Sequence, residues 1–439
     1  MRQGRGAFGL LKTGISRVRV PALAVMAVVI ASAGMVVGTG ATPSGASSKI
    51  STKAVSAALA YTGGKAGAAN SKKSPISIGW VSDETALTGH AGNTAGVKAA
   101  VALINDDLGG VAGGHPLKLV SCFITTSDSQ GASCAQQMLN NPAVKVVLEG
   151  ELLTGEASFI GTMAGAKPVI GVFTSPSVTT QNAYYLDGGI PSQLAAVTYI
   201  AKTLGAKTVA VLGPNLPGVS AALGMFKALF AALGATATVV LYPSSSTDLE
   251  APIAAANANS SDAIFLATST TGECIATAKA FTQLGITKPV VSLPDCLEAS
   301  VKKALGDYPK WGYVFTSLNP LATHGAASQT AAFDAAMAAQ GDTSLETSGY
   351  SANTFGAVLT VAQWINTLGA SGYTAAAIAS TAAAFTGPTF MGDPSIKFGV
   401  PPFTAIGSIR ALIYTYKGKG KFSENTGGNW ICPPVPTCT

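Results

Sequence analysis

The hydrophobic pattern from residue 74 onward alternates between short apolar runs and longer segments with helical spacing. The run PISIGWVS predicts a buried strand, GNTAGVKAAVALIND has the spacing of a helix, and HPLKLVSCFI predicts a second strand. The pattern continues with a helix at 130–139, a strand KVVLEG, a helix at 155–163 and a strand PVIGVF. Because strands alternate with helices, we expect a parallel sheet with helices on both faces.

The same alternation runs a second time after Gly188 and Gly189. The predicted strands are KTVAVLG, ATVVLY, DAIFLAT, PVVSLP and WGYVFTS, and the predicted helices lie at 192–204, 219–233, 248–257 and 272–284. Later residues are mainly helical until a final strand, IRALIYTYKG. Two runs of one motif predict an α/β protein with two lobes, and helices without new strands complete a lobe that already has its sheet.

The N-terminal segment has the pattern of an export signal. Five basic residues lie within the first 19 positions, an apolar run covers 20–37, and small residues follow at 39–41. We therefore predict a secretory signal peptide over residues 1–41 and an exported protein of the periplasm or cell-wall space. An uncleaved membrane tether stays open, because about 18 apolar residues approach the length that spans a bilayer. No Cys follows the run, so a lipid anchor is not expected.

Two further segments lie outside the predicted lobes. Residues 42–74 are rich in Ser, Gly, Ala and Lys and contain no acidic residue, so we predict a flexible linker with, at most, a short helix at 53–60. The last segment, 421–439, contains GGNWICPPVPTCT and is predicted to be a tail closed by a local disulfide.

The charge distribution argues against nucleic acid as a partner. The formal net charge is +6, and the five basic residues of the export signal account for five of these charges, which leaves +1 for the rest. A nucleic-acid-binding protein normally carries a basic patch on its folded part.

Six cysteines follow the signal as three close pairs: Cys122 with Cys134, Cys274 with Cys296, and Cys432 with Cys438. An even number in an exported chain indicates disulfides, and we favour pairing of nearest neighbours, although six cysteines allow 15 connectivities. We expect no metal site, because CxxC is absent and His90, His115 and His324 are scattered along the chain.

Motifs that bind cofactors or perform catalysis are absent from the sequence. There is no GxxxxGK[ST] loop, no GxGxxG after the first strand and no GxSxG nucleophile elbow. Without a nucleophile, base and orienting group at a known spacing, we expect a protein that is not an enzyme and has no cofactor.

Ligands of open parallel sheets bind at the carboxyl ends of the strands, and this rule selects four loops. They are residues 83–92, 149–155, 173–177 and 294–297. Thr154, Thr174 and Ser175 offer hydroxyl groups in these loops, and Asp295 offers a carboxylate. For each of these four side chains, a role as helix cap or turn residue stays open as the alternative.

One stretch, ISIGWVSDETALTGHAGNTAGVKAAVALINDDLGGVAGGHPLKLV, resembles the opening of the type I periplasmic binding proteins, in particular the branched-chain amino acid (Leu/Ile/Val) binding family. The matching features, in order, are Ile78-Gly79, Thr88-Gly89, Ile104-Asn105, Gly109-Gly110, Gly113 and the strand at 116–120. The resemblance continues through KPVIGVFTS and TFGAVLTVAQWI and covers residues 74–417.

The resemblance implies a Venus-flytrap fold, in which two parallel sheets flanked by helices are joined by three crossing strands. We place the crossings near residues 184–189, 314–317 and 388–395. The first lobe is then expected at 75–186 plus 318–390, and the second at 187–317 plus 391–420.

The resemblance also implies roles for single residues. Thr154 matches a hydroxyl that meets a ligand carboxylate, Phe173 and Ser175 match positions that contact the carboxylate and ammonium, and Asp295 matches the acid that pairs with the α-ammonium. Thr88 and the neighbouring Thr174 complete the expected ligand-binding set. Two aromatic positions of amino-acid binders are missing, since Gly89 and Pro217-Gly218 stand there, and Asp295 is shorter than the usual Glu. An amino acid, a small amide and a carboxylate therefore all stay open as the solute.

The function that the resemblance implies is that of the extracytoplasmic solute-binding component of an ABC transporter, which delivers a small molecule to a membrane permease. A sensory module of the same fold, which reports the solute to a receptor, is the alternative.

Overall fold

The structure is a computed structural model, and the residues that it describes are 50–84, 90–173, 180–244, 246–268, 270–316, 327–343, 349–435 and 438. The predicted export signal and the first residues of the linker lie outside these ranges. Among the described residues, no helix is both long and apolar enough to cross a membrane.

The first sheet is fully parallel. It contains β1 (Ile76–Asp83), β2 (Leu117–Ile124), β3 (Val144–Glu149), β4 (Val169–Gly171) and β5 (Ala183–Tyr185) in the order β2-β1-β3-β4-β5. All eight residues of β1 are buried, as expected for a strand in the centre of a sheet that is covered on both faces.

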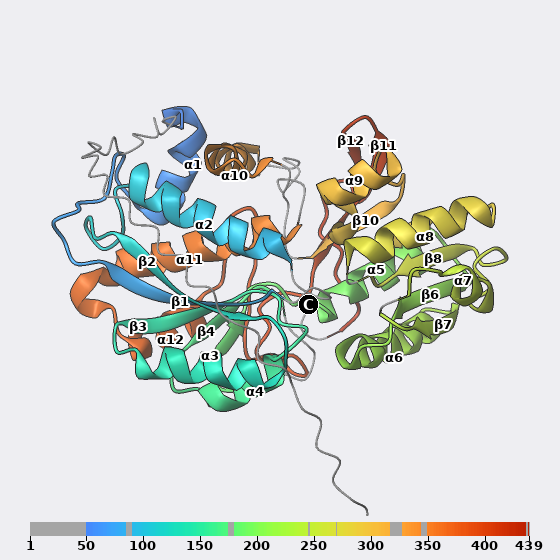
Figure 1. The fold of residues 1–439 in the computed structure, drawn as a ribbon, viewed down its shortest axis with the longest axis horizontal. Helices are drawn as coiled ribbons and strands as arrows, with labels where there is room; N and C mark the ends of the chain where they lie inside the picture. Colours follow the sequence, from blue (N-terminus) through green and yellow to red (C-terminus); the bar gives the residue numbers. More distant parts are fainter. Residues whose placement is uncertain are drawn as a thin grey trace, which may run out of the picture. The chain divides into compact units, whose positions relative to one another are not determined.

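Helices from two distant parts of the chain cover this sheet (Figure 1). The near ones in sequence are α2 (Ala91–Asp106), α3 (Ser129–Asn140) and α4 (Glu156–Met163), and the distant ones are α11 (Gly349–Gly372) and α12 (Ala375–Ala384). A further distant helix, α10 (Ala327–Gln340), packs on α2. α11 packs directly on α2, where a Cβ atom on Gly96 would lie 2.0 Å from the backbone oxygen of Ser351. Glycine at position 96 therefore permits the close approach of the two helices.

The second sheet is mixed. Its strands are β6 (Thr208–Pro214), β7 (Thr236–Tyr242), β8 (Ala263–Leu266), β9 (Val290–Ser292), β10 (Gly312–Thr316), β11 (Ala411–Gly418) and β12 (Lys421–Glu424), in the order β12-β11-β10-β9-β8-β6-β7. The five strands from β6 to β10 pair in parallel, whereas β11 pairs antiparallel with both β10 and β12. The prediction of two α/β lobes is confirmed, with an antiparallel edge added to the second.

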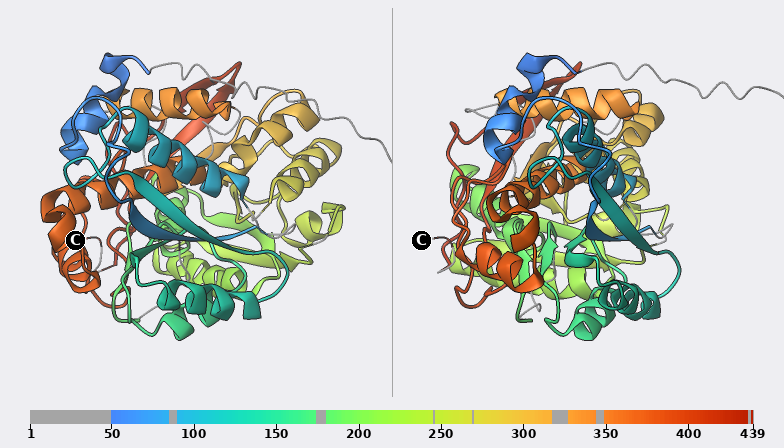
Figure 2. Two further views of the ribbon diagram at one scale, coloured as in Figure 1. Left: turned by 60° about the vertical axis from the view of Figure 1, so that its left-hand side comes forward. Right: turned by 90° about the vertical axis from the view of Figure 1, so that its left-hand side faces the viewer.

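The helices of the second lobe follow the predicted alternation with strands. In Figure 2 they are coloured from green to gold. They are α5 (Leu194–Thr198), α6 (Pro217–Ala232), α7 (Glu250–Ala255), α8 (Thr271–Gln283) and α9 (Ala299–Leu305), with a short 3-10 turn, η3 (Pro294–Leu297), before α9. The single helix predicted at 192–204 differs: a 3-10 turn η1 (Pro191–Gln193) precedes α5, and a π-helical segment η2 (Tyr199–Thr203) follows it.

Asp187 lies where the chain leaves the first sheet for the second. Its carboxylate accepts hydrogen bonds from the backbone N–H of Gly189 at 2.8 Å, from the hydroxyl of Thr316 at 2.7 Å and from the amide of Asn353 at 2.7 Å. Thr316 ends β10 of the second sheet and Asn353 belongs to α11 on the first, so one buried carboxylate joins the connection to both lobes.

The short helix allowed at 53–60 is present as α1 (Thr52–Thr62), but the prediction of a flexible linker is wrong here, because this helix packs on the first lobe. Ser51 caps its N-terminus, and Val55 and Ala58 are buried against α10 and α11. Tyr61 donates a hydrogen bond from its hydroxyl to the backbone oxygen of Pro388, at 3.0 Å. The apolar residues three positions apart therefore form a packed face that the composition of the segment concealed.

The predicted C-terminal tail also joins the fold. β12 pairs with β11, and Ile431 forms a bridge with Ala411, so this segment extends the second sheet. The structure contains the three disulfide bonds between neighbouring cysteines, Cys122–Cys134, Cys274–Cys296 and Cys432–Cys438.

Candidate functional site: the cleft between the lobes

Side chains from both lobes meet around two small cavities at the carboxyl ends of the strands. The cavities measure about 30 and 20 Å³, and Phe173, Gln193, Leu293 and Tyr350 line both of them. Such volumes hold about one water molecule each. A solute the size of an amino acid therefore enters only if the two lobes move apart.

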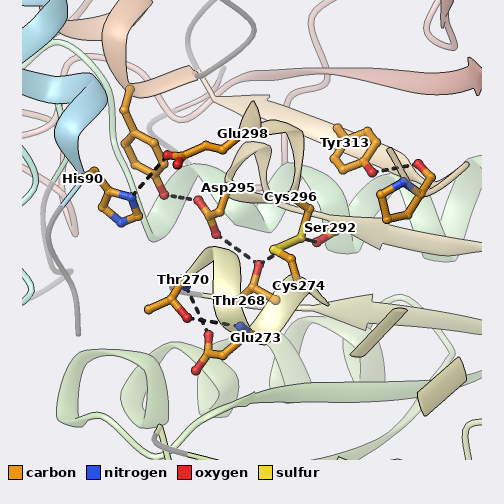
Figure 3. The surroundings of a disulfide bond; sticks show 12 residues. His90, Thr268, Thr270, Glu273, Cys274, Ser292, Asp295, Cys296, Glu298 and Tyr313 are labelled. Carbon is orange, nitrogen blue, oxygen red and sulfur yellow. Dashed lines mark hydrogen bonds and ion pairs between the residues drawn. A yellow bond between two sulfur atoms is a disulfide. The ribbon is translucent and has the colours of Figure 1, made fainter. Parts of the chain in front are cut away.

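Asp295 is the centre of the contacts on the second lobe. It lies in η3, is fully buried, and accepts a hydrogen bond from the hydroxyl of Tyr350 on α11. A second hydrogen bond, at 3.0 Å, comes from the hydroxyl of Thr268 after β8 (Figure 3). Burial raises the pKa of Asp295 to about 6, against the opposing effects of nearby His90 and of these two hydrogen bonds. The carboxylate thus joins the lobes through Tyr350.

On the first lobe, His90 contacts residues of both lobes. It precedes α2, stacks on the ring of Tyr350 with 4.0 Å between ring centroids, and is 4% exposed. Its Nε2 atom lies 2.9 Å from Oε2 of Glu151, which follows β3, and its Nδ1 atom lies 4.0 Å from Oε1 of Glu298 on the second lobe.

The charge state of His90 follows from these neighbours. Burial alone lowers the pKa of His90, but Glu151, Glu298 and Asp295 together raise it well above its usual value. The three neighbouring carboxyl groups therefore favour the protonated form of His90.

Glu149, the last residue of β3, is a further buried acid two residues before Glu151. Its side chain is fully buried, accepts a hydrogen bond from the hydroxyl of Tyr185 at 2.9 Å, and has no hydrogen-bond partner for its other oxygen. Burial, and to a lesser degree the charge of Glu156, raises its pKa well above the usual value and favours the neutral acid.

The residues expected from the sequence fall into three groups. Phe173 lines both cavities, and Asp295 bonds to two of the residues that line them. Thr154 follows β3 and donates its backbone N–H to Asp83 at 3.0 Å, within the first lobe. Thr88, Thr174 and Ser175 lie outside the described residues, so their roles stay predictions.

Sequence reasoning did not single out His90, Glu151, Glu298 or Tyr350. His90 and Glu151 lie inside two of the four loops selected by the strand-end rule, so the loops were predicted but these residues were not. Tyr350, the second residue of α11, is far in sequence from the strands that the structure describes, and only the packing of α11 on α2 brings it to the cleft. In the described part of the chain, no group of His, Cys, Asp and Glu side chains is suited to hold a metal ion.

Solved structures of similar fold are numerous but distant in sequence. A leucine-binding protein from Thermotoga maritima is 18% identical, with a TM-score of 0.63 over 80% of this chain and 98% of that one. A solute-binding protein of an ABC transporter from Rhodopseudomonas palustris, in complex with p-hydroxybenzoic acid, is 19% identical, with a TM-score of 0.64 over 80% and 95%. A fatty acid ABC transporter substrate-binding protein from Thermomonospora curvata is 16% identical, with a TM-score of 0.62 over 82% and 94%. These likenesses confirm the two-lobed fold.

Sequence comparison alone gives a family but no close relative. No curated protein matches the chain significantly. The family model described as periplasmic binding protein matches residues 75–399, which is more than half of the 439 residues. The chain therefore belongs to the periplasmic binding protein family, whose members bind solutes and are not enzymes.

Proposed function

We propose that this protein is the extracytoplasmic solute-binding component of an ABC transporter and that it binds a small amino acid-like or carboxylate solute between its lobes. The observation that carries the proposal is the buried contact between Tyr350 of the first lobe and Asp295 of the second, at the carboxyl ends of the strands. In open parallel sheets this edge is where ligands bind.

The solutes named for proteins of similar fold support a small carboxylate-bearing ligand. Leucine, p-hydroxybenzoic acid and a fatty acid differ in shape, but each carries a carboxyl group. Thr88, Thr154, Thr174 and Ser175 would meet that group on the first lobe, with Phe173 beside it. Asp295 would pair with an ammonium group, and a hydrogen bond of this kind contributes about 1.5 to 3 kcal/mol.

Closure about a hinge would follow from solute contacts that exist only when the lobes meet. A solute held by Thr154 and Asp295 contacts both lobes, so it binds the closed arrangement more tightly than the open one. This difference in affinity shifts the equilibrium toward closure. Asp187 lies at the connection between the lobes and would be part of the hinge. The lobe boundaries at 75–186 plus 318–390 and 187–317 plus 391–420 belong to the same proposal.

The family places the protein outside the cytoplasm. We further propose that residues 1–41 direct export. Cleavage of this segment would release the protein, and its retention would leave the protein tethered to the membrane. The proposed partner is a membrane permease. No nucleic acid or cofactor takes part in this scheme.

The test is a thermal-shift screen of the purified protein against amino acids, amides and carboxylates. A cleft ligand at a hundred times its Kd adds about 2.7 kcal/mol to the free energy of unfolding. The variant Thr154→Ala/Asp295→Asn should lose the shift, and the exposed control Thr287→Ala/Asp106→Asn should keep it. Equal shifts in both variants would refute this binding site, and X-ray scattering with and without the active solute would show whether the lobes close.

A further inference from the structure

Acidic side chains are concentrated at the cleft. The chain has only 21 Asp and Glu residues among 439, yet six of them lie at the carboxyl ends of β1, β3 and β9. They are Asp83, Glu84, Glu149, Glu151, Asp295 and Glu298. Of these six, Glu151 lines one of the two cavities, and Asp295 accepts hydrogen bonds from two of the residues that line them.

Three of these acids surround one point between the lobes. Glu151 is 2% exposed and lines the smaller cavity, Asp295 is fully buried, and Glu298 lies 4.0 Å from His90. None of the described residues that line the two cavities is Lys or Arg. Arg410, the one arginine beyond the export signal, pairs at 3.2 Å with Asp393 instead. His90 is thus the only cation that the described side chains place among these three carboxylates.

Glu151 also has capacity for another partner. Its Oε2 atom is buried and lies at ion-pair distance from His90, but the geometry of this contact is not that of a hydrogen bond. The ion pair with His90 compensates this buried oxygen only in part, and a well-aligned donor from a solute would satisfy it better. Because Glu151 lines the cavity with Thr268 and Tyr350, that donor would bind next to Asp295.

More carboxyl groups lie at this point than one α-ammonium requires, and this favours a solute with a second cationic group over an anionic one. A single α-ammonium needs one acidic partner, and the family resemblance assigns Asp295 to it. An anionic group beside Glu151, Asp295 and Glu298 would be repelled, and burial strengthens the repulsion because the local dielectric constant is low.

We propose that the solute is a basic amino acid, whose cationic side chain takes the place of the His90 ring beside Glu151 and Glu298 while Asp295 pairs with its α-ammonium. This inference rests on the proposed solute-binding function and specifies its substrate class. In this scheme His90 neutralises the acids when the lobes meet without solute, and it turns away when a primary amine or guanidinium group enters.

The test is isothermal titration calorimetry at pH 7.5 with L-lysine, L-arginine, putrescine, L-leucine and 4-hydroxybenzoate. We expect binding of L-lysine or L-arginine, weaker binding of putrescine because it lacks the carboxylate, and little binding of the last two. Glu151→Gln should weaken binding of the basic amino acid about tenfold or more. His90→Gln should strengthen it, because the internal competitor is removed.

The matched control is Asp106→Asn, which removes the same charge at the exposed far end of α2, about 24 Å along the helix from His90. This variant should bind like the unchanged protein. Tight binding of L-leucine or 4-hydroxybenzoate without binding of L-lysine or L-arginine would overturn the basic solute and leave the solute-binding function intact. Failure of every class in the wider thermal-shift screen would overturn both.

Discussion

The hydroxyl of Tyr350 donates a hydrogen bond to the carboxylate of Asp295, and this contact joins α11 on the first lobe to η3 on the second. Burial, followed by the charge of Asp295, raises the pKa of Tyr350 well above its usual value, so the phenol keeps its proton and acts as the donor. Any solute group that bonds to the same carboxylate oxygen must replace this hydroxyl.

We therefore expect Tyr350→Phe to bind an amine-bearing solute several-fold more tightly than the unchanged protein. Without the hydroxyl, closure in the absence of solute is less favourable, and a smaller share of the solute's binding energy is spent on opening the cleft. Calorimetric titration measures the change. The control Tyr313→Phe removes a hydroxyl that bonds to Pro309 within the second lobe, at 2.8 Å, and should leave the affinity unchanged. A loss of affinity in Tyr350→Phe would instead show that the hydroxyl contacts the solute.

From the buried carboxyl group of Asp187 we predict that the free energy of unfolding of the protein falls as the pH rises. Burial raises the pKa of its carboxyl from 3.8 to about 7, which outweighs the hydrogen bonds from Gly189, Thr316 and Asn353. Between these two values the folded protein holds a proton that the unfolded chain has released, so the free energy of unfolding decreases with pH, by up to about 4 kcal/mol over the interval.

Denaturant titrations from pH 4 to pH 8 measure this effect. Asp187→Asn cannot titrate, so its free energy of unfolding should depend less on pH over this range than that of the unchanged protein. The exposed Asp262 is the control, because hydrogen bonds from the backbone of Thr208 and Lys207 lower the pKa of its carboxyl. Asp262→Asn should keep the decline, and an equal decline in Asp187→Asn would assign it to other groups.

The disulfide between Cys274 and Cys296 adjoins the proposed binding carboxylate. Cys296 follows Asp295 directly, and the bond ties η3 to α8, while Thr268 contacts both Asp295 and the sulfur of Cys296 (Figure 3). We expect the Cys274→Ser/Cys296→Ser variant to lose about 2 to 4 kcal/mol of stability and also to bind solute at least several-fold more weakly.

The first-lobe disulfide supplies the comparison. Cys122→Ser/Cys134→Ser removes a bond between β2 and α3 and should cost stability with an unchanged solute affinity at a temperature where both variants are folded. Calorimetric titration of both variants distinguishes the outcomes. Equal affinities in the two would mean that η3 holds Asp295 in place without the covalent bond.

Helix α1 should contribute to the stability of the first lobe although it precedes the region matched by the family. Ala58 is fully buried, whereas Ser56 on the same helix is exposed. Ala58→Asp buries an unpaired charge and should lower the free energy of unfolding by about 3 kcal/mol or more, while Ser56→Asp should change it by less than about 0.5 kcal/mol. Urea unfolding measures both, and similar small effects would indicate that α1 is only loosely attached.

The sequence by itself determined the fold class. Strand and helix periods are local properties, and the alternation of the two, repeated twice, leaves few arrangements besides two α/β lobes. The strand-end rule also selected loops that contain His90, Glu151 and Asp295, because in a parallel sheet all carboxyl ends share one edge. Proximity along the chain likewise favoured the disulfide pairing that the structure contains.

Only the tertiary structure decided which side chains meet. Tyr350 lies 55 residues from Asp295, and His90 and Glu298 belong to different lobes. No local sequence pattern therefore predicts either of these two contacts. The pairing of charges depends on how the lobes approach each other, and burial, which sets the pKa values, exists only after packing. The same reason explains α1: its short apolar face becomes significant only when α10 and α11, nearly 300 residues later, supply the surface that covers it.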